Sequence, residues 1–76
     1  MSAPSSLARL SVGDTAVVRR VSGRRTVVRR LLEMGLVPGT AVTLRRVAPL
    51  GDPIELHVRN YALSIRRDEA GGIEIE

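Results

Sequence analysis

The segment 31–40 limits the possible folds most, because two sites that break regular structure lie within it. From Arg24 to Met34 the chain has no proline or glycine, and its apolar residues fall on one side of a helical wheel. Gly35 follows where a helix end favours a left-handed residue. Pro38 and Gly39 then stand in the order that a type II turn requires. The sequence therefore predicts a helix that ends at Met34, two turns, and a strand that begins directly after them.

Alternation of apolar and polar side chains predicts β-strands in most of the remaining chain. The predicted strands are 15–21, 41–48, 54–59, 61–67 and 73–76. The period breaks near Arg45 and Arg46, which predicts a bulge there. Asn60 is predicted to turn a tight hairpin with a left-handed backbone, and 68–72 to form a second turn. Five short strands and one helix are typical of a mainly β protein, a small closed barrel in which closure removes the exposed sheet edges.

The chain is long enough for one domain, predicted to span residues 7–76 after a disordered leader at 1–6. Leu7 and Leu10 are expected to dock on the barrel. No cysteine is present, so disulfides and thiolate metal sites are excluded. No apolar run approaches the roughly 20 residues that span a bilayer, and the start of the chain lacks the features of a signal peptide. We therefore expect a cytoplasmic protein without membrane insertion.

Two motifs carry a resemblance to a known family. Arg30–Leu36 reads RLLEMGL and is followed by Pro38-Gly39, and Ala48–Pro53 reads APLGDP before an alternating strand. The chain resembles the FeoA family from about Leu7 to Ile75. This resemblance implies an SH3-like barrel with the helix inserted after the first strand. It also implies a small accessory protein of bacterial ferrous iron uptake that binds and regulates the cytoplasmic part of the FeoB transporter, which carries a G-protein domain.

A partner-binding surface is predicted where apolar side chains are held on rigid backbone. In the loop 49–53 two prolines fix φ, Gly51 permits an unusual angle, and Asp52 can accept hydrogen bonds from nearby amides. Gly35, Pro38 and Gly39 are predicted to act as structural turns. For Met34 and Leu36 the alternative is that they close the end of the barrel. The predicted partner-binding residues are Met34, Leu36, Val37, Pro49, Leu50, Gly51, Asp52 and Pro53.

Catalytic and metal-binding residues are scarce in this sequence. His57 is the only histidine, and the alternation of its strand predicts that it is solvated. An Fe(II) site needs two histidines and a carboxylate, or several oxygen ligands, so His57 with Glu55, Glu74 or Glu76 amounts to an adventitious zinc site. No nucleophile with a positioned base and no phosphate loop is recognisable. We predict no catalytic residue, no metal, no cofactor and no enzymatic activity.

The positive net charge is compatible with several other classes of partner. All 12 basic residues are arginine and the net charge is +4, which suits nucleic acid, anionic lipid, an acidic protein, or simply a solvated surface. A nucleic-acid-binding SH3-like barrel is the alternative function, although Tyr61 is the only aromatic residue for base stacking. As a variant of the transporter hypothesis, Arg24, Arg25, Arg45 or Arg46 could act as an arginine finger on GTP hydrolysis by FeoB. A weak homo-oligomer formed through strand 73–75 is a further alternative.

Overall fold

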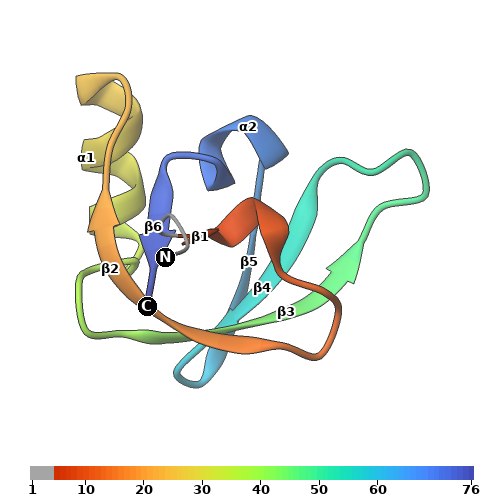
Figure 1. Cartoon of the computed structure of the whole chain (residues 1–76). Helices are drawn as coiled ribbons and strands as arrows, with labels where there is room; N and C mark the ends of the chain where they lie inside the picture. Colours follow the sequence, from red (N-terminus) through yellow and green to blue (C-terminus); the bar gives the residue numbers. More distant parts are fainter. Residues whose placement is uncertain (1–4) are drawn as a thin grey trace.

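The structure, a computed structural model, describes residues 5–76 and is shown in Figure 1. It confirms the prediction of a mainly β protein. Its elements are β1 (Ser5–Ser6), η1 (Leu7–Arg9), β2 (Thr15–Val21), α1 (Arg25–Glu33), β3 (Ala41–Val47), β4 (Ile54–Val58), β5 (Tyr61–Ile65), α2 (Arg67–Ala70) and β6 (Ile73–Ile75).

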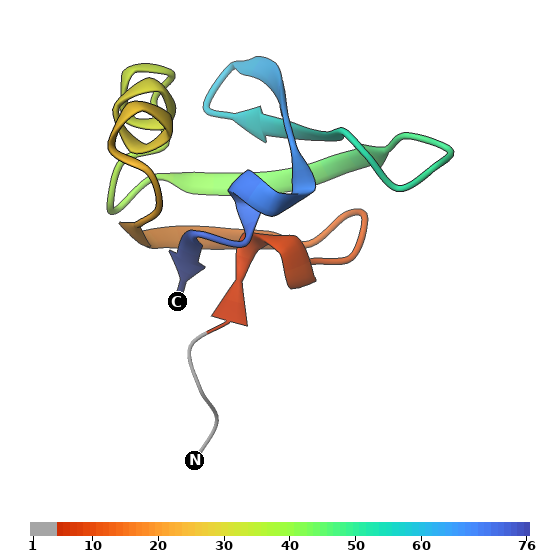
Figure 2. The ribbon, with the colours of Figure 1, turned by 90° about the horizontal axis from the view of Figure 1, so that it is seen from above.

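The strands form one antiparallel sheet in the order β1-β6-β2-β3-β4-β5. The sheet curls around the core, with α1 standing beside it and α2 near its rim (Figures 1 and 2). Within residues 5–76, β5 pairs with β4 alone and β1 with β6 alone. The prediction that closure removes the sheet edges is therefore wrong. Strand 73–75 lies between β1 and β2, so both of its edges are already paired and the alternative of a homo-oligomer formed through it loses its basis.

The turn between α1 and β3 has the predicted geometry. Gly35 adopts φ 99°, its N–H donates to the Leu32 carbonyl at 3.0 Å, and the Leu36 N–H donates to the Leu31 carbonyl at 3.1 Å. These two bonds satisfy carbonyls that a helix end would otherwise leave unpaired. Gly39 adopts φ 94°, and the Thr40 N–H donates to the Val37 carbonyl at 3.1 Å, as in a type II turn.

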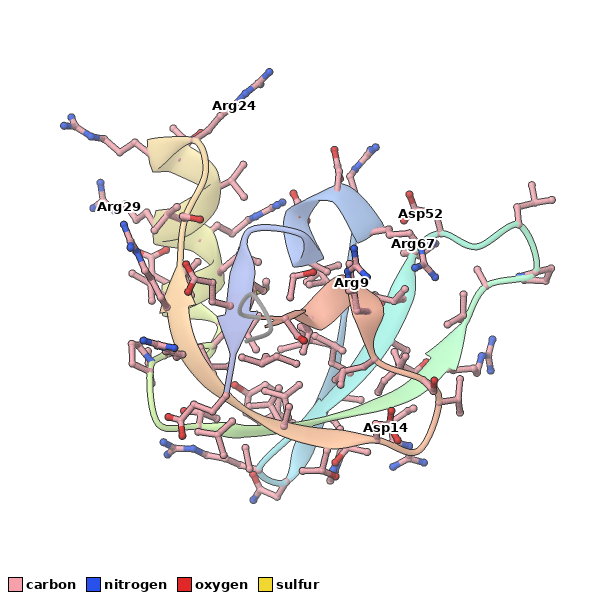
Figure 3. All side chains as sticks on the ribbon, in the orientation of Figure 1. Arg9, Asp14, Arg24, Arg29, Asp52 and Arg67 are labelled. Atoms are coloured by element: carbon pink, nitrogen blue, oxygen red, sulfur yellow. The ribbon has the colours of Figure 1, made fainter. Side chains whose placement is uncertain are left out.

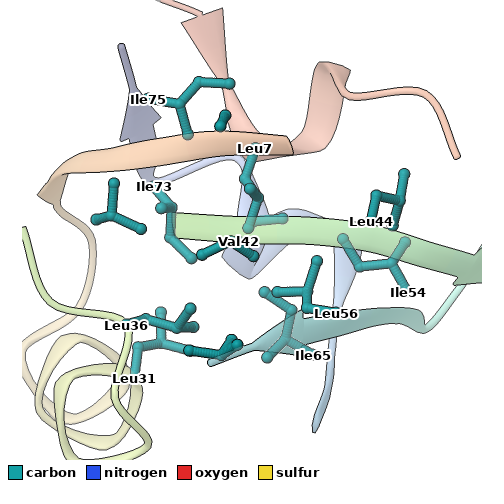
Figure 4. Packing of buried hydrophobic residues seen from close by; sticks show 14 residues of the cluster. Leu7, Leu31, Leu36, Val42, Leu44, Ile54, Leu56, Ile65, Ile73 and Ile75 are labelled. Carbon is teal, nitrogen blue, oxygen red and sulfur yellow. The ribbon is translucent and has the colours of Figure 1, made fainter. Parts of the chain in front are cut away.

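One aliphatic core fills the barrel (Figure 4). Leu7 is fully buried and Leu10 packs against the cluster, which confirms that this segment docks on the barrel. The inward residues of β4 are buried while their neighbours are partly exposed, as the alternation predicts. The largest fully buried side chains are Leu7, Leu31, Leu36, Ile54, Leu56, Ile73, Val18, Val42 and Val58.

Several element boundaries differ from the prediction. The expected bulge in β3 is confirmed by the register shift between Leu44 and Arg46. In the β4–β5 hairpin it is Arg59, with φ 56°, that has the left-handed backbone, so the assignment to Asn60 is wrong. The predicted strand 61–67 stops at Ile65, and α2 occupies most of the predicted turn 68–72.

The start of the chain also differs from the prediction in part. Ser5 and Ser6 were assigned to the leader, but they form β1 and pair with Ile75 and Glu74 of β6. The rest of the predicted leader, residues 1–4, lies outside the described residues.

Candidate partner-binding site

The predicted partner-binding residues fall into two separate regions. In Figure 1 the loop between β3 and β4 extends away on the side of the molecule opposite α1. Leu50 in that loop is 97% exposed, whereas Leu36 at the helix end is 0% exposed. Leu36 therefore belongs to the core, and its assignment to a partner surface is wrong. Met34 and Val37 are half-buried, and Met34 packs against the core.

The loop 49–53 is held closed at its base by backbone bonds. The Gly51 N–H donates to the Ala48 carbonyl at 2.7 Å, and the Ala48 N–H donates to the Pro53 carbonyl at 3.0 Å. Gly51 has φ 91°, which only glycine adopts at low cost, as predicted. Leu50 is thus presented at the tip of a loop that its own backbone bonds close at the base.

Arg67 fastens this loop to the rest of the molecule. Its backbone N–H donates to Asp52 Oδ1 at 3.0 Å, which confirms Asp52 as an acceptor for an amide. Its side chain donates from Nε to the Gly51 carbonyl at 2.9 Å and from Nη1 to the Ala8 carbonyl at 3.2 Å. Asp52 and Arg67 lie together at the base of the loop in Figure 3. The role of Arg67 could not be predicted from the sequence, because nothing local distinguishes it among the 12 arginines.

A groove brings part of the helix end next to the start of β4. Met34 and Pro53 both line it, together with Ser64 and Ile65 of β5. Tyr61 also joins α1 to β5, since its hydroxyl donates a hydrogen bond to the Met34 carbonyl. Met34 and Pro53 therefore lie in the same groove, whereas Leu50 lies on a different surface.

The comparison with known proteins decides the family. Residues 5–76 match the model of the FeoA domain. The chain belongs to the FeoA domain family. A fusion of Fe(2+) transport protein A with the Fe(2+) transporter FeoB from Porphyromonas gingivalis is 44% identical over 70 residues. That match covers 92% of this chain and 8% of the fusion protein, so the chain corresponds to a small part of that relative.

Solved FeoA structures share the fold. The FeoA protein of Chlorobium tepidum is 44% identical with a TM-score of 0.88, covering 93% of this chain and 68% of that one. FeoA of Stenotrophomonas maltophilia, complexed with zinc and described as an SH3 domain protein, is 26% identical with a TM-score of 0.78, covering 95% of this chain and 89% of that one. The SH3-like barrel prediction is thereby confirmed.

His57 lies on the outer face of this FeoA domain. It is half-buried on β4, opposite Thr43 of β3 and Ala62 of β5. The sheet order separates β4 from β6 by two strands, so Glu74 is not brought to it. Within residues 5–76 no group of three or more His, Cys, Asp or Glu side chains is placed to hold a metal ion.

The arginines of this FeoA domain are spread over several elements. Arg24 and Arg29 point outward from the α1 region in Figure 3, and Arg45 and Arg46 are exposed on β3. Arg29 pairs with Glu33 at 3.5 Å, and Arg30 of α1 forms an ion pair with Glu69 of α2. The four predicted arginine-finger candidates therefore lie in two places, at the start of α1 and on β3.

Across the described part of the chain, neither helix has the length and apolar content needed to cross a bilayer.

Proposed function

We propose that this chain is a non-enzymatic accessory protein of ferrous iron transport that binds the cytoplasmic part of a FeoB transporter and regulates it. The observation that carries the proposal is the Porphyromonas gingivalis relative, in which an equivalent domain and FeoB are one polypeptide. Covalent linkage holds two domains at high effective concentration, which is useful where they act on one another. The same association, placed on the cytoplasmic side of the membrane, is what we propose for this chain.

The loop 49–53 supports an interaction of this kind. An exposed leucine on a fixed backbone can enter an apolar pocket of the partner without the entropic cost of ordering a mobile loop. Leu50 meets both conditions, since its side chain is exposed and the loop is fastened by Arg67. Pro49, Gly51, Asp52 and Pro53 contribute the shape of the loop, and Leu50 is its apolar contact.

A binding titration tests the proposal. The cytoplasmic part of FeoB is titrated with this chain in the nucleotide-free state, with GDP and with a GTP analogue. We expect binding that Leu50→Glu weakens by at least about 10-fold, since a charge would enter an apolar contact. Val12→Glu is the matched control, because Val12 is another exposed apolar residue, 61% exposed, in the turn before β2. Leu36→Glu is unsuitable, since it places a charge in the core.

Two outcomes contradict parts of the proposal. If the chain does not bind in any nucleotide state, the cytoplasmic part of FeoB is not its partner. If Leu50→Glu and Val12→Glu bind equally well, the loop 49–53 is not the contact.

Regulation is tested by the rate at which FeoB hydrolyses GTP with and without the chain. An arginine finger would make one of the changes Arg24→Ala, Arg25→Ala, Arg45→Ala or Arg46→Ala abolish any stimulation. If stimulation survives all four changes, the chain acts by binding alone.

A further inference from the structure

β5 presents a free sheet edge. It pairs with β4 from Val58↔Tyr61 to Ile54↔Ile65, and no other strand within residues 5–76 pairs with it. The pair Val58↔Tyr61 closes a two-residue hairpin and is therefore hydrogen-bonded, and hydrogen-bonded pairs alternate along an antiparallel ladder. The N–H and C=O groups of Ala62 and Ser64 consequently point away from β4. Both residues are exposed.

This edge lacks the features that normally prevent strand addition. Natural edge strands carry charges, prolines or bulges. The five residues of β5, Tyr61–Ile65, include no charged residue and no proline, and their register with β4 is unbroken. None of these three features is present along the five residues of β5.

Positive charge lies at both ends of the edge. Arg59 precedes β5 in the hairpin turn and Arg66 follows it, and both are exposed. A groove beside the second half of β5 is lined by Met34 and Ile65 and flanked by Arg30 and Arg66. The carboxylate in this groove, Glu69, is already engaged by the Arg30 ion pair and by the Arg66 N–H at 3.1 Å. An incoming strand with acidic ends would therefore meet arginines.

We propose that the free edge of β5 binds an extended acidic segment of a partner protein as an added strand. Backbone bonds to Ala62 and Ser64 would supply the pairing, and acidic residues at the ends of the segment would meet Arg59 and Arg66. A second copy of this chain suits the edge less well. In the antiparallel register that pairs Ala62 of one copy with Ser64 of the other, Arg59 would lie opposite Arg67 of the second copy, and like charges placed opposite each other destabilise a strand pair.

Amide hydrogen exchange with two model peptides tests this site. The first peptide is Asp-Glu-Val-Thr-Val-Thr-Val-Glu-Asp, and the second has lysine at every acidic position. We expect the acidic peptide to slow exchange at the Ala62 and Ser64 amides and the basic peptide to leave it unchanged. Ala62→Pro removes one outward N–H at a position where an edge strand tolerates proline, and should abolish the effect.

Charge variants provide a second test of the site, one that does not require a proline substitution. Arg59→Asn keeps a residue that tolerates the left-handed backbone, and Arg66→Gln keeps a polar side chain. Each change should weaken binding of the acidic peptide by about 2- to 5-fold, as expected for a charge pair at the rim of an interface. Increasing the salt concentration should weaken this binding further. Arg19→Gln on β2, which removes one exposed arginine from another strand, should leave the affinity unchanged.

Three results would overturn the proposal. They are equal affinity for the two peptides, protection that appears only outside β5, and protection of Ala62 that grows with protein concentration in the absence of peptide. The last result would identify a second copy as the occupant. This site shares only Pro53, which lines the groove, with the loop 49–53. The assay contains no FeoB, so the inference can fail while the proposed function stands, and the reverse also holds.

Discussion

Gly35 and Gly39 both have positive φ in the turn between α1 and β3, yet they face different surroundings. A Cβ added at Gly35 would collide with the Tyr61 hydroxyl, which donates to the neighbouring Met34 carbonyl. A Cβ added at Gly39 would meet nothing within 4 Å. Gly35 is therefore required for two reasons, backbone conformation and close approach of a side chain, and Gly39 for the first reason only.

Gly35→Ala should lower the free energy of unfolding by about 2–3 kcal/mol, and Gly39→Ala by about 1 kcal/mol, the cost of the left-handed backbone alone. Urea unfolding followed by circular dichroism measures both. In a Tyr61→Phe background, which removes the colliding oxygen, the cost of Gly35→Ala should approach that of Gly39→Ala. Equal costs for the two glycine changes in the wild-type background would refute the role of Tyr61.

Thr40 offers a second residue-level prediction. Its side chain is 4% exposed, and its hydroxyl has no hydrogen-bond partner within residues 5–76. Thr40→Val keeps the shape and removes a buried polar atom, so the free energy of unfolding should rise by about 1 kcal/mol. The same urea experiment measures it, and Thr15→Val, which breaks the hydrogen bond between Thr15 and Thr43 at 2.7 Å, should not stabilise the fold.

At the scale of elements, the loop 49–53, η1 and α2 depend on one another through Arg67. Asp52 accepts the first amide of α2, and the Arg67 side chain bonds to the loop and to η1. A helix of four residues has little stability of its own, so these bonds from outside it fix its position. The loop and α2 should therefore loosen together.

Arg67→Leu tests this coupling. Loss of two exposed hydrogen bonds should lower the free energy of unfolding by about 1–2 kcal/mol. It should also speed amide exchange at Gly51 and weaken partner binding although Leu50 is intact. Arg66→Leu is the matched control, since no hydrogen bond of its side chain to the loop is seen in the described residues. An unchanged amide exchange rate at Gly51 in Arg67→Leu would show that the loop keeps its conformation without the Arg67 side chain.

Elements with strong local signals could be predicted from the sequence, and elements set by distant partners could not. Gly35, Pro38 and Gly39 determine their turns locally, and the alternation in β4 follows from its own residues. The start of α2 is fixed by Asp52, 15 residues away, and β1 exists only because β6 pairs with it. Leu36 faces inward because it packs with Leu31 in the core, a choice that the turn residues leave open. The candidate loop was recognisable, but Arg67, which fastens it, was not.

At the scale of the whole molecule, the last strand lies inside the sheet and not at its edge. β6 lies between β1 and β2, and its Ile73 and Ile75 belong to the core. The stability expected for a domain of 76 residues is about 4–11 kcal/mol. Each buried isoleucine contributes about 2–5 kcal/mol by the cost of truncating it to alanine. The fold therefore depends on its final few residues.

Truncation after Gly72 should abolish the folded state. The expected signs are loss of dispersion in the amide NMR spectrum and loss of a cooperative thermal transition. Glu74→Gln, which changes a side chain of the same strand without removing core atoms, should retain both. A truncated chain that still unfolds cooperatively would show that β1 and β2 can complete the core without β6.

The pairing of Ser5 with Ile75 has a mechanical consequence. Both ends of the described chain leave from the same end of one short antiparallel strand pair. Tension applied through the two ends would separate β1 from β6 one residue pair at a time, and would not shear all of their pairs at once. A domain tethered at both ends would therefore open first at β1, under low force, while β2 to β6 remain folded.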